Sequence, residues 1–158
     1  MMAKSRPDDR TNRIAEDAGR AMYERDHAAR ALGIALLDVR PGFARMSMLV
    51  RPDMVNGHRT CHGGLIFTLA DTAFAYSCNS HNKNAVAQHC AITFVQPARE
   101  GDLLTAEGVE QSLSGRSGIY DIKVTNQKGE TIALFRGNSR VIKGEVATGY
   151  LPSPEEPS

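Results

Sequence analysis

One carboxylate stands in the most apolar segment of this 158-residue chain. Between Gly64 and Cys78, Asp71 is the only charged residue. An aspartate has poor propensity for the middle of a helix, and an apolar helix adds a cost of desolvation. Buried carboxylates with perturbed pKa values cluster at functional sites, so Asp71 is a candidate catalytic acid. In the alternative interpretation, Asp71 lies on a solvated strip of the helix or in an ion pair.

A second candidate group is the segment His62-Gly63-Gly64, at the start of the same predicted helix. Paired glycines leave backbone N–H groups unshielded by a Cβ. Together with the positive end of the helix dipole, these donors suit an oxyanion or a polarised carbonyl. A tight turn that needs glycine would give the same pattern, so the motif alone is a weak signal.

The spacing of the two groups limits how they could cooperate. Gly63 and Asp71 are separated by about 12 Å along a helix that rises 1.5 Å per residue. One carbonyl cannot touch both groups of the same chain. If they act together, Gly63 of one subunit must meet Asp71 of another, which two antiparallel helices side by side allow. This hypothesis implies a composite site and an obligate dimer with two equivalent sites.

Hydrophobic patterns predict the elements that position these groups. Residues 8–32 indicate a polar amphipathic helix, and 34–40 and 43–50 indicate two strands joined by a Pro-Gly turn. Residues 63–80 predict a helix that is apolar on nearly its whole circumference, which requires protein around it. Period-two alternation between short glycine turns then predicts an antiparallel meander that ends near residue 143.

An all-round apolar helix beside a meander is most simply buried if the twisted sheet curls around it. The expected fold class is therefore α+β, with an antiparallel sheet around a central helix and an extra N-terminal helix. Residues 1–143 are expected to form one domain. The segment 144–158, rich in prolines and acids, is expected to be a disordered tail.

Composition excludes several classes of protein. Nineteen Lys and Arg residues nearly balance 18 Asp and Glu residues, and the net charge of +1 favours neither nucleic acid nor an anionic membrane as a partner. The three cysteines contain no CxxC pair, which argues against a zinc ribbon or a disulfide framework. The polar N-terminus resembles neither a signal nor a transit peptide, and no apolar stretch could cross a bilayer. We therefore expect a cytoplasmic protein.

The stretch from Met54 to Phe94 resembles the PaaI family of hotdog-fold acyl-CoA thioesterases, which is linked to bacterial phenylacetate catabolism. The resemblance rests on a loop asparagine, the HGG segment and the acid of LAD, and it extends through the meander. It implies hydrolysis of phenylacetyl-CoA or ring-hydroxylated phenylacetyl-CoA-like thioesters. It also implies homodimers that pair into homotetramers, and no cofactor beyond the coenzyme A of the substrate.

The resemblance also implies roles for individual residues. Asp71 corresponds to the family's catalytic acid, which acts as a nucleophile or as a base for water. Gly63 corresponds to the residue whose N–H polarises the thioester carbonyl. Asn56 matches the loop asparagine that positions the water or the carbonyl. His62 is expected to order the loop and contact the thioester region, and Gly64 to give the substrate access to the helix end.

Two further roles are assigned less directly. Families of this fold commonly use a Ser or Thr on the strand after the helix, and here the segment AVAQHCAIT offers Gln88 or His89 instead. The phosphates of coenzyme A would favour cationic side chains, for which Arg136, Arg140 and Lys143 on the last strand are candidates. For each of these cations a solvated edge is the simpler interpretation.

Three other functions remain open from the sequence. A hotdog hydratase or dehydratase would pair His62 with an acid across the dimer, although the chain lacks the Asp-x4-His spacing of one such family. A non-catalytic acyl-CoA-binding module would bind the ligand without releasing thiol. A metal site would use His58, Cys61 and His62, which lie close together in the sequence, with His81 and His89 elsewhere, but closed zinc sites usually show more regular paired spacing. We expect no metal.

Overall fold

The computed structural model describes residues 9–149 of the chain. The elements are α1 (Asp9–Arg25), α2 (His27–Ala31), β1 (Ala35–Arg40), β2 (Phe43–Leu49), the 3₁₀ turn η1 (Pro52–Met54), α3 (Gly63–Cys78), β3 (Lys83–Phe94), β4 (Leu103–Ser114), β5 (Ser117–Thr125) and β6 (Thr131–Glu145).

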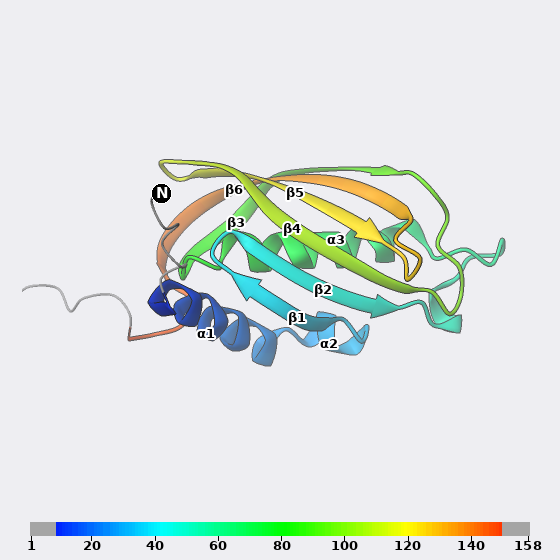
Figure 1. Ribbon diagram of the computed structural model, residues 1–158, viewed down its shortest axis with the longest axis horizontal. Coiled ribbons are helices and arrows are strands. Elements are labelled where there is room, and N and C mark those ends of the chain that lie inside the picture. The colour runs from blue at the N-terminus through cyan, green and yellow to red at the C-terminus, as the bar shows by residue number, and fades with distance from the viewer. Residues whose placement is uncertain (1–8, 150–158) are drawn as a thin grey trace, which may run out of the picture.

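The strands form a single antiparallel sheet in the order β1-β2-β4-β5-β6-β3. The long strands curve past α3, which lies against one face of the sheet (Figure 1). Strand β3 follows α3 in sequence but pairs with β6, so α3 provides the connection to the far edge of the sheet. The expected α+β architecture, a sheet curled around a central apolar helix, is confirmed.

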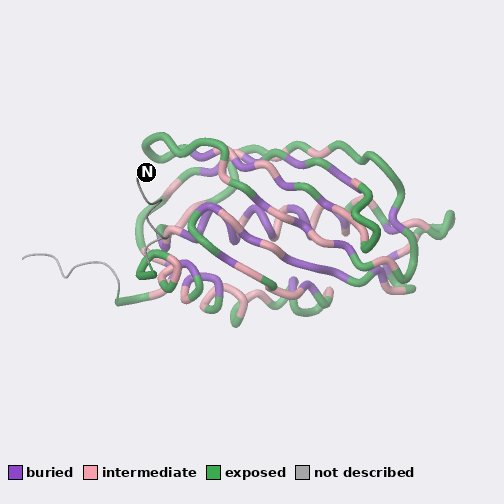
Figure 2. The backbone as a smooth tube through the Cα atoms, viewed as in Figure 1, coloured by how far each residue is buried: buried purple, intermediate pink, exposed green. Residues whose placement is uncertain are grey.

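Aromatic side chains join α3 to the middle of the sheet. The ring of Phe74 lies 5.9 Å from that of Phe135 and 5.8 Å from that of Tyr120, and Phe67 packs edge-on against Phe135 at 5.3 Å. Gly137 of β6 is required beneath Phe74, because a Cβ there would come within 2.7 Å of the ring. The buried residues in Figure 2 accordingly concentrate where α3 faces the strands. The position of α3 is therefore set by close packing.

The N-terminal helix expected over 8–32 is in fact two helices, with residue 8 outside the described part. The break is at Asp26, whose Oδ1 accepts a hydrogen bond from the backbone N–H of Ala29 at 3.1 Å and so caps α2. The other oxygen of Asp26 accepts a hydrogen bond from the hydroxyl of Tyr76 in α3 at 3.2 Å. The side chain that interrupts the helix thus also ties this region to the central helix.

The end of β6 corrects the expectation of a disordered tail over 144–158. Val146 is buried, and the Asn82 side chain accepts a hydrogen bond from the Ala147 N–H at 2.7 Å and donates one to the Ala147 carbonyl at 2.9 Å. The folded domain therefore continues beyond residue 143. Residues 150–158 of the expected tail lie outside the described part of the chain.

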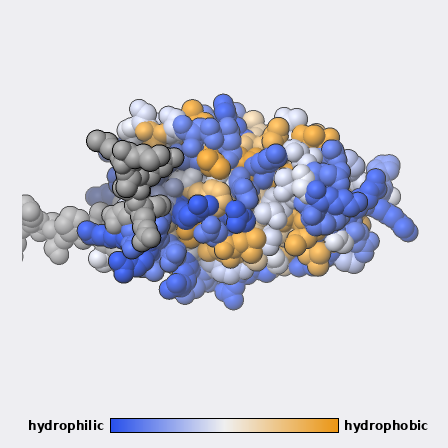
Figure 3. Space-filling model, viewed as in Figure 1, coloured by the Kyte–Doolittle hydropathy of each residue, from blue (hydrophilic) through white to orange (hydrophobic). Residues whose placement is uncertain are grey.

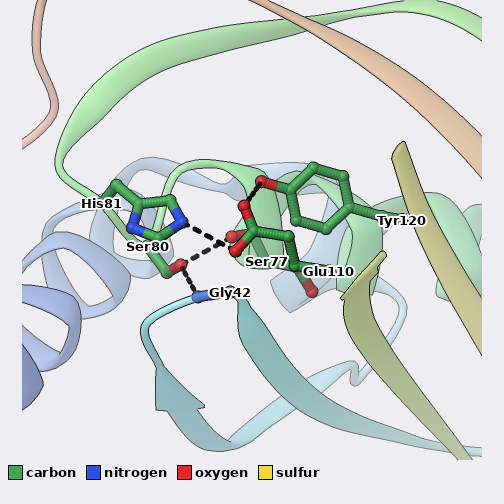
Figure 4. A network of polar contacts seen from close by, with 6 residues as sticks. All are labelled: Gly42, Ser77, Ser80, His81, Glu110 and Tyr120. Atoms are coloured by element: carbon green, nitrogen blue, oxygen red, sulfur yellow. Dashed lines mark hydrogen bonds and ion pairs between the residues drawn. The ribbon is translucent and has the colours of Figure 1, made fainter. Parts of the chain in front are cut away.

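A polar network fixes the chain just after α3 (Figure 4). The hydroxyl of Ser80 accepts a hydrogen bond from the Gly42 N–H at 2.7 Å. The His81 Nε2 lies 3.2 Å from one oxygen of Glu110, and Tyr120 donates to the other oxygen at 3.3 Å. Because Gly42 belongs to the β1–β2 turn and Glu110 to β4, this network ties the C-terminal end of the helix to two parts of the sheet.

Candidate active site

Helix α3 begins with two backbone donors that have no acceptor in the described part of the chain. His62 occupies the N-cap position, and its carbonyl accepts hydrogen bonds from the N–H groups of Leu65 at 3.0 Å and Ile66 at 3.3 Å. The N–H groups of Gly63 and Gly64 precede the first intrahelical bonds and remain without a partner. Both are therefore available to an anion or a carbonyl oxygen at the positive end of the helix.

The two glycines differ in what surrounds them. A Cβ at Gly63 would lie 3.1 Å from the ring of Phe94, whereas a Cβ at Gly64 would meet only the His62 ring, at 3.7 Å. Gly63 therefore packs beneath an aromatic ring at the end of β3, while Gly64 faces open space. A hollow of about 340 Å³ lies at this helix end, with Gly63, Ile66 and Phe94 in its lining. A ligand could thus approach the free amides closely.

Asn56 organises the loop that precedes the helix. Its side-chain oxygen accepts hydrogen bonds from the N–H of His58 at 2.9 Å and from the N–H and hydroxyl of Thr60 at 3.2 and 3.1 Å. Arg59 between them has a positive φ of 61°. The side-chain nitrogen of Asn56 has no partner within residues 9–149. The oxygen therefore holds the loop, which leaves the amide N–H groups free to donate outward.

Asp71 lies on the one face of α3 that the described chain leaves open. The opposite faces are buried by the sheet, but Asp71 is only half-buried, and so are Thr68, Thr72 and Ala75 beside it. The expectation that protein surrounds the whole helix is therefore wrong for the single chain. A helix strip of this kind requires either solvent or a second molecule.

Burial raises the pKa of the Asp71 carboxyl, and a contact with the Cys90 thiol opposes that shift. The sulfur of Cys90 lies 3.9 Å from Oδ1 of Asp71. Within the described residues Asp71 forms no ion pair, so the salt-bridge interpretation finds no support in the single chain. The carboxylate has a weak donor on one side and an open face on the other.

A β-bulge decides which residue of β3 faces Asp71. Ala87 opposes Ser139 of β6, and after the bulge Cys90 opposes Gly137. Ser139 is buried, and a Cβ at Gly137 would meet the Phe74 ring of α3, so both positions lie on the inner face of the sheet. Ala87 and Cys90 therefore share that inner face although they are three residues apart. Regular alternation would have brought residues 87, 89 and 91 to the same face.

Gln88 and His89 are the candidates for the strand position, and the structure brings neither to the carboxylate. Both side chains are exposed on β3, and Cys90 makes the contact with Asp71 instead. No sequence signal marks the bulge.

The three cations proposed for coenzyme A lie on β6 and differ in their partners. Arg136 donates to both oxygens of Asp121, at 2.6 and 2.8 Å, across the outer face of the sheet. Arg140 and Lys143 are exposed and form no ion pair with residues of the described chain. A phosphate would therefore compete with a carboxylate at Arg136 but not at the other two.

Other classes of site find no support in the described residues. Over residues 9–149, no three His, Cys, Asp or Glu side chains come together in a group that could hold a metal ion. None of the helices in that range is both long and apolar enough to cross a membrane. On the face shown in Figure 3, hydrophobic side chains form separate patches between hydrophilic ones.

Comparison with known proteins identifies the family. The model of the thioesterase superfamily matches residues 58–133, which include the HGG segment, α3 and most of the meander. The acyl-coenzyme A thioesterase PaaI of Escherichia coli (strain K12) is 49% identical over 126 residues, which cover 80% of this chain and 90% of the relative. The chain belongs to the PaaI family of hotdog-fold thioesterases.

Solved structures agree with this membership. The PaaI protein from the phenylacetic acid degradation operon of Escherichia coli superposes with a TM-score of 0.84 at 47% identity, covering 85% of this chain and 98% of the other. A mutant of the phenylacetic acid degradation protein PaaI from Thermus thermophilus gives a TM-score of 0.70 at 36% identity, covering 73% and 98%. The thioesterase described here is therefore an enzyme with the fold that the HGG and LAD segments indicated.

Proposed function

We propose that this PaaI-type thioesterase hydrolyses phenylacetyl-CoA or ring-hydroxylated phenylacetyl-CoA-like substrates. The observation that carries the proposal is the arrangement on α3: free amides at its N-terminus and a half-buried carboxylate on its open face. The aromatic acyl group is proposed from the relatives, whose names tie them to phenylacetic acid degradation. Coenzyme A enters as part of the substrate, and the proposed chemistry needs no other cofactor.

The proposed active unit is a homodimer with two composite sites. Strand β3 pairs with β6 along one edge, and its other edge is unpaired within the described chain. An exposed strand of 12 residues is a ready template for a second copy of itself. Antiparallel pairing of two β3 strands would also bring the open faces of two α3 helices together, with Gly63 of one subunit near Asp71 of the other.

A tetramer is proposed as the complete assembly. The outer face of the sheet carries Val109 and Leu134, which are 44% and 49% exposed. They flank the Arg136–Asp121 ion pair around a hollow of about 590 Å³. A mixed polar and apolar surface of this kind suits contact between dimers.

The three cysteines are free thiols, which suits a reducing compartment, and we place the enzyme in the cytosol.

The reaction requires little beyond these groups, because a thioester is already activated toward acyl transfer. In the proposed course, the ionised Asp71 removes a proton from water as the water oxygen attacks the thioester carbonyl. The negative charge that develops on the carbonyl oxygen is stabilised by the Gly63 N–H and the helix dipole of the partner. The tetrahedral intermediate then collapses, the C–S bond breaks, and coenzyme A leaves as a thiolate that takes up a proton.

Direct attack by Asp71 is the alternative course for the same carboxylate. It would form a mixed anhydride, which water would then hydrolyse. A single turnover in ¹⁸O-labelled water identifies direct attack that is followed by hydrolysis at the aspartyl carbon. Direct attack followed by hydrolysis at the aspartyl carbon transfers an unlabelled carboxylate oxygen to the product, whereas general-base catalysis places the label in the product in the first turnover.

Residues around the two groups have proposed supporting roles. The free amide of Asn56 would hold the attacking water or the acyl carbonyl, while its oxygen keeps the loop in place. His62 would fix the helix start and contact the thioester region, and Gly64 would admit the substrate. Arg140 and Lys143 are the proposed partners of the coenzyme A phosphates, with Arg136 dependent on release from Asp121.

A panel of thioesters tests the proposed function. Phenylacetyl-CoA, hydroxyphenylacetyl-CoA, a short aliphatic and a long aliphatic acyl-CoA are each assayed by release of free thiol. We expect the aromatic substrates to give the highest kcat/KM, and Asp71→Asn to lower kcat by about two to three orders of magnitude. Thiol release at the wild-type rate by that variant would remove Asp71 from catalysis, and binding without thiol release would make the protein a non-catalytic acyl-CoA-binding module.

A further inference from the structure

We propose that Cys90 is a positioning residue for the catalytic carboxylate. Its thiol donates a hydrogen bond to Asp71, holds that side chain toward β3 and favours its ionised form. This inference rests on the proposed function, because it assigns Cys90 a role only if Asp71 acts as a carboxylate in the reaction.

The contact is specific to this cysteine. The sulfur of Cys90 lies 3.9 Å from Oδ1 of Asp71, within the longer reach of a thiol donor. The other two thiols bond to backbone carbonyls, Cys61 to His62 at 3.7 Å and Cys78 to Ala75 at 3.4 Å. Among the described residues, Cys90 is therefore the cysteine whose thiol faces an acidic side chain.

The bulge in β3 is what aims Cys90 at the helix. Without the extra residue between Ala87 and His89, the side chains of β3 beyond that point would exchange faces, and Cys90 would point away from α3. Bulges beside active sites commonly re-aim one side chain at some cost in regular pairing. Here the result is a weak, neutral donor placed against a carboxylate that has no ion pair in the described chain.

The electrostatic surroundings fit a donor rather than a nucleophile. Desolvation raises the pKa of Asp71, and the Cys90 contact lowers it. In return, burial and the negative charge of Asp71 raise the pKa of the Cys90 thiol, so the thiol keeps its proton. Cys78, on α3 itself, also has a raised pKa, of about 12, and is neutral. Strands β2, β4, β5 and β6 bring no charged group against this carboxylate in the described part of the chain.

The pH dependence of kcat/KM tests the proposal. Activity needs ionised Asp71, so the acid limb of the profile follows its pKa. Removal of the donor in Cys90→Ala should move that limb upward by about half a pH unit, the effect of one weak hydrogen bond to a charged group. Cys90→Ser keeps a donor and should leave the limb nearer the wild-type position.

The control is Ile92→Val on the same inner face of β3, which removes a methylene group without touching a donor. Ile92→Val should leave the acid limb in place. If Cys90 had a merely structural role, Cys90→Ala and Ile92→Val would both change kcat, and neither would move the acid limb. Coincident acid limbs for wild type and Cys90→Ala would overturn the proposal. Inactivity of the wild type toward every acyl-CoA would instead overturn the proposed function.

A spectroscopic measurement keeps the proposal testable if Cys90→Ala folds poorly. The S–H stretching band of the infrared spectrum reports hydrogen bonding by a thiol. In Asp71→Asn the acceptor is weaker, so the component assigned to Cys90 should move to higher wavenumber, with the components of Cys61 and Cys78 unchanged. The component that disappears from the spectrum of Cys90→Ser is the S–H band of Cys90. An unmoved Cys90 component would show that its thiol does not bond to Asp71.

Discussion

Gly63 and Asp71 lie on one unbroken helix, the first at its N-terminus and the second two turns further along. The free N–H of Gly63 and the carboxylate of Asp71 therefore cannot act on one thioester carbonyl within a single chain. The face of α3 that carries Asp71 is left open by the sheet, and the edge of β3 beside it is unpaired in the described chain. These three features together lead to the proposed composite site.

Replacement of Asp71 by asparagine should stabilise the fold while it removes activity. The pKa of Asp71 is higher in the folded state than in the unfolded state, so its stabilising contribution exists at low pH and is lost as pH rises through the folded pKa. At pH 7 the ionised carboxylate carries a desolvation cost in the folded state, and the neutral amide of Asn does not carry this cost. We expect the free energy of unfolding to rise by roughly 0.5–2 kcal/mol at pH 7. The gain should vanish below about pH 4, where both states of the wild type are protonated.

Asp121→Asn provides a control of opposite sign. The Arg136 guanidinium lowers the pKa of Asp121, so its contribution is present at neutral pH and is lost as pH falls through the folded pKa. This variant should lose up to about 1 kcal/mol at pH 7, as expected for an exposed pair. Urea unfolding of both variants across pH measures the two effects. A destabilised Asp71→Asn at pH 7 would contradict the assigned burial cost.

Two substitutions at Asn56 separate its loop-holding oxygen from its free amide. Asn56→Asp keeps an oxygen that can accept from His58 and Thr60, so the melting temperature should stay close to that of the wild type. The same variant lacks the amide donor, and kcat should fall by about tenfold or more. Asn56→Ala loses both functions and should lower stability by about 1 kcal/mol as well. Full activity of Asn56→Asp would show that the amide has no part in catalysis.

The proposed phosphate contacts can be tested by comparing thioesters of coenzyme A with thioesters of N-acetylcysteamine, a truncated thiol. Arg140→Ala and Lys143→Ala should each raise KM for the CoA thioester severalfold, because each removes one charged contact. KM for the N-acetylcysteamine thioester, which has no phosphate, should not change. Arg136→Ala is the matched comparison, since that guanidinium is already paired with Asp121. Equal effects on both substrates would mean that these cations do not bind phosphate.

Hydrophobic periodicity was sufficient to predict most of the elements. The helix expected over 63–80 is observed as α3, and the strands expected over 34–40 and 43–50 differ from β1 and β2 by one residue at a single end each. Period-two alternation also gave the four later strands. These features depend on local patterns of burial, which the sequence carries directly.

Features that depend on register or on distant partners were not predictable. A one-residue bulge in β3 exchanges the faces of every side chain beyond it, so the contact between Cys90 and Asp71 could not be read from the sequence. The pairing of Arg136 with Asp121 needs the register of β5 against β6. The helix break at Asp26 is fixed by a cap and by Tyr76, which is distant in sequence.

A variant that removes the Gly63 donor alone makes the central claim testable. Gly63 is the first residue of α3, a position that proline favours, and His62 before it already has the ψ of 131° that precedes a proline. Gly63→Pro should therefore delete the N–H and keep the helix. Gly63→Ala adds a similar Cβ beneath Phe94 but retains the N–H, so it controls for crowding. We expect Gly63→Pro to lower kcat by about 100-fold and Gly63→Ala to lower it much less.

The most direct test co-expresses Asp71→Asn and Gly63→Pro subunits in equal amounts. A mixed dimer joins the intact Gly63 of one subunit to the intact Asp71 of the other, which restores one of its two sites. Random pairing should then give about one quarter of the wild-type kcat, far above either variant alone. Activity no greater than the mean of the two separate variants would contradict a site shared between subunits.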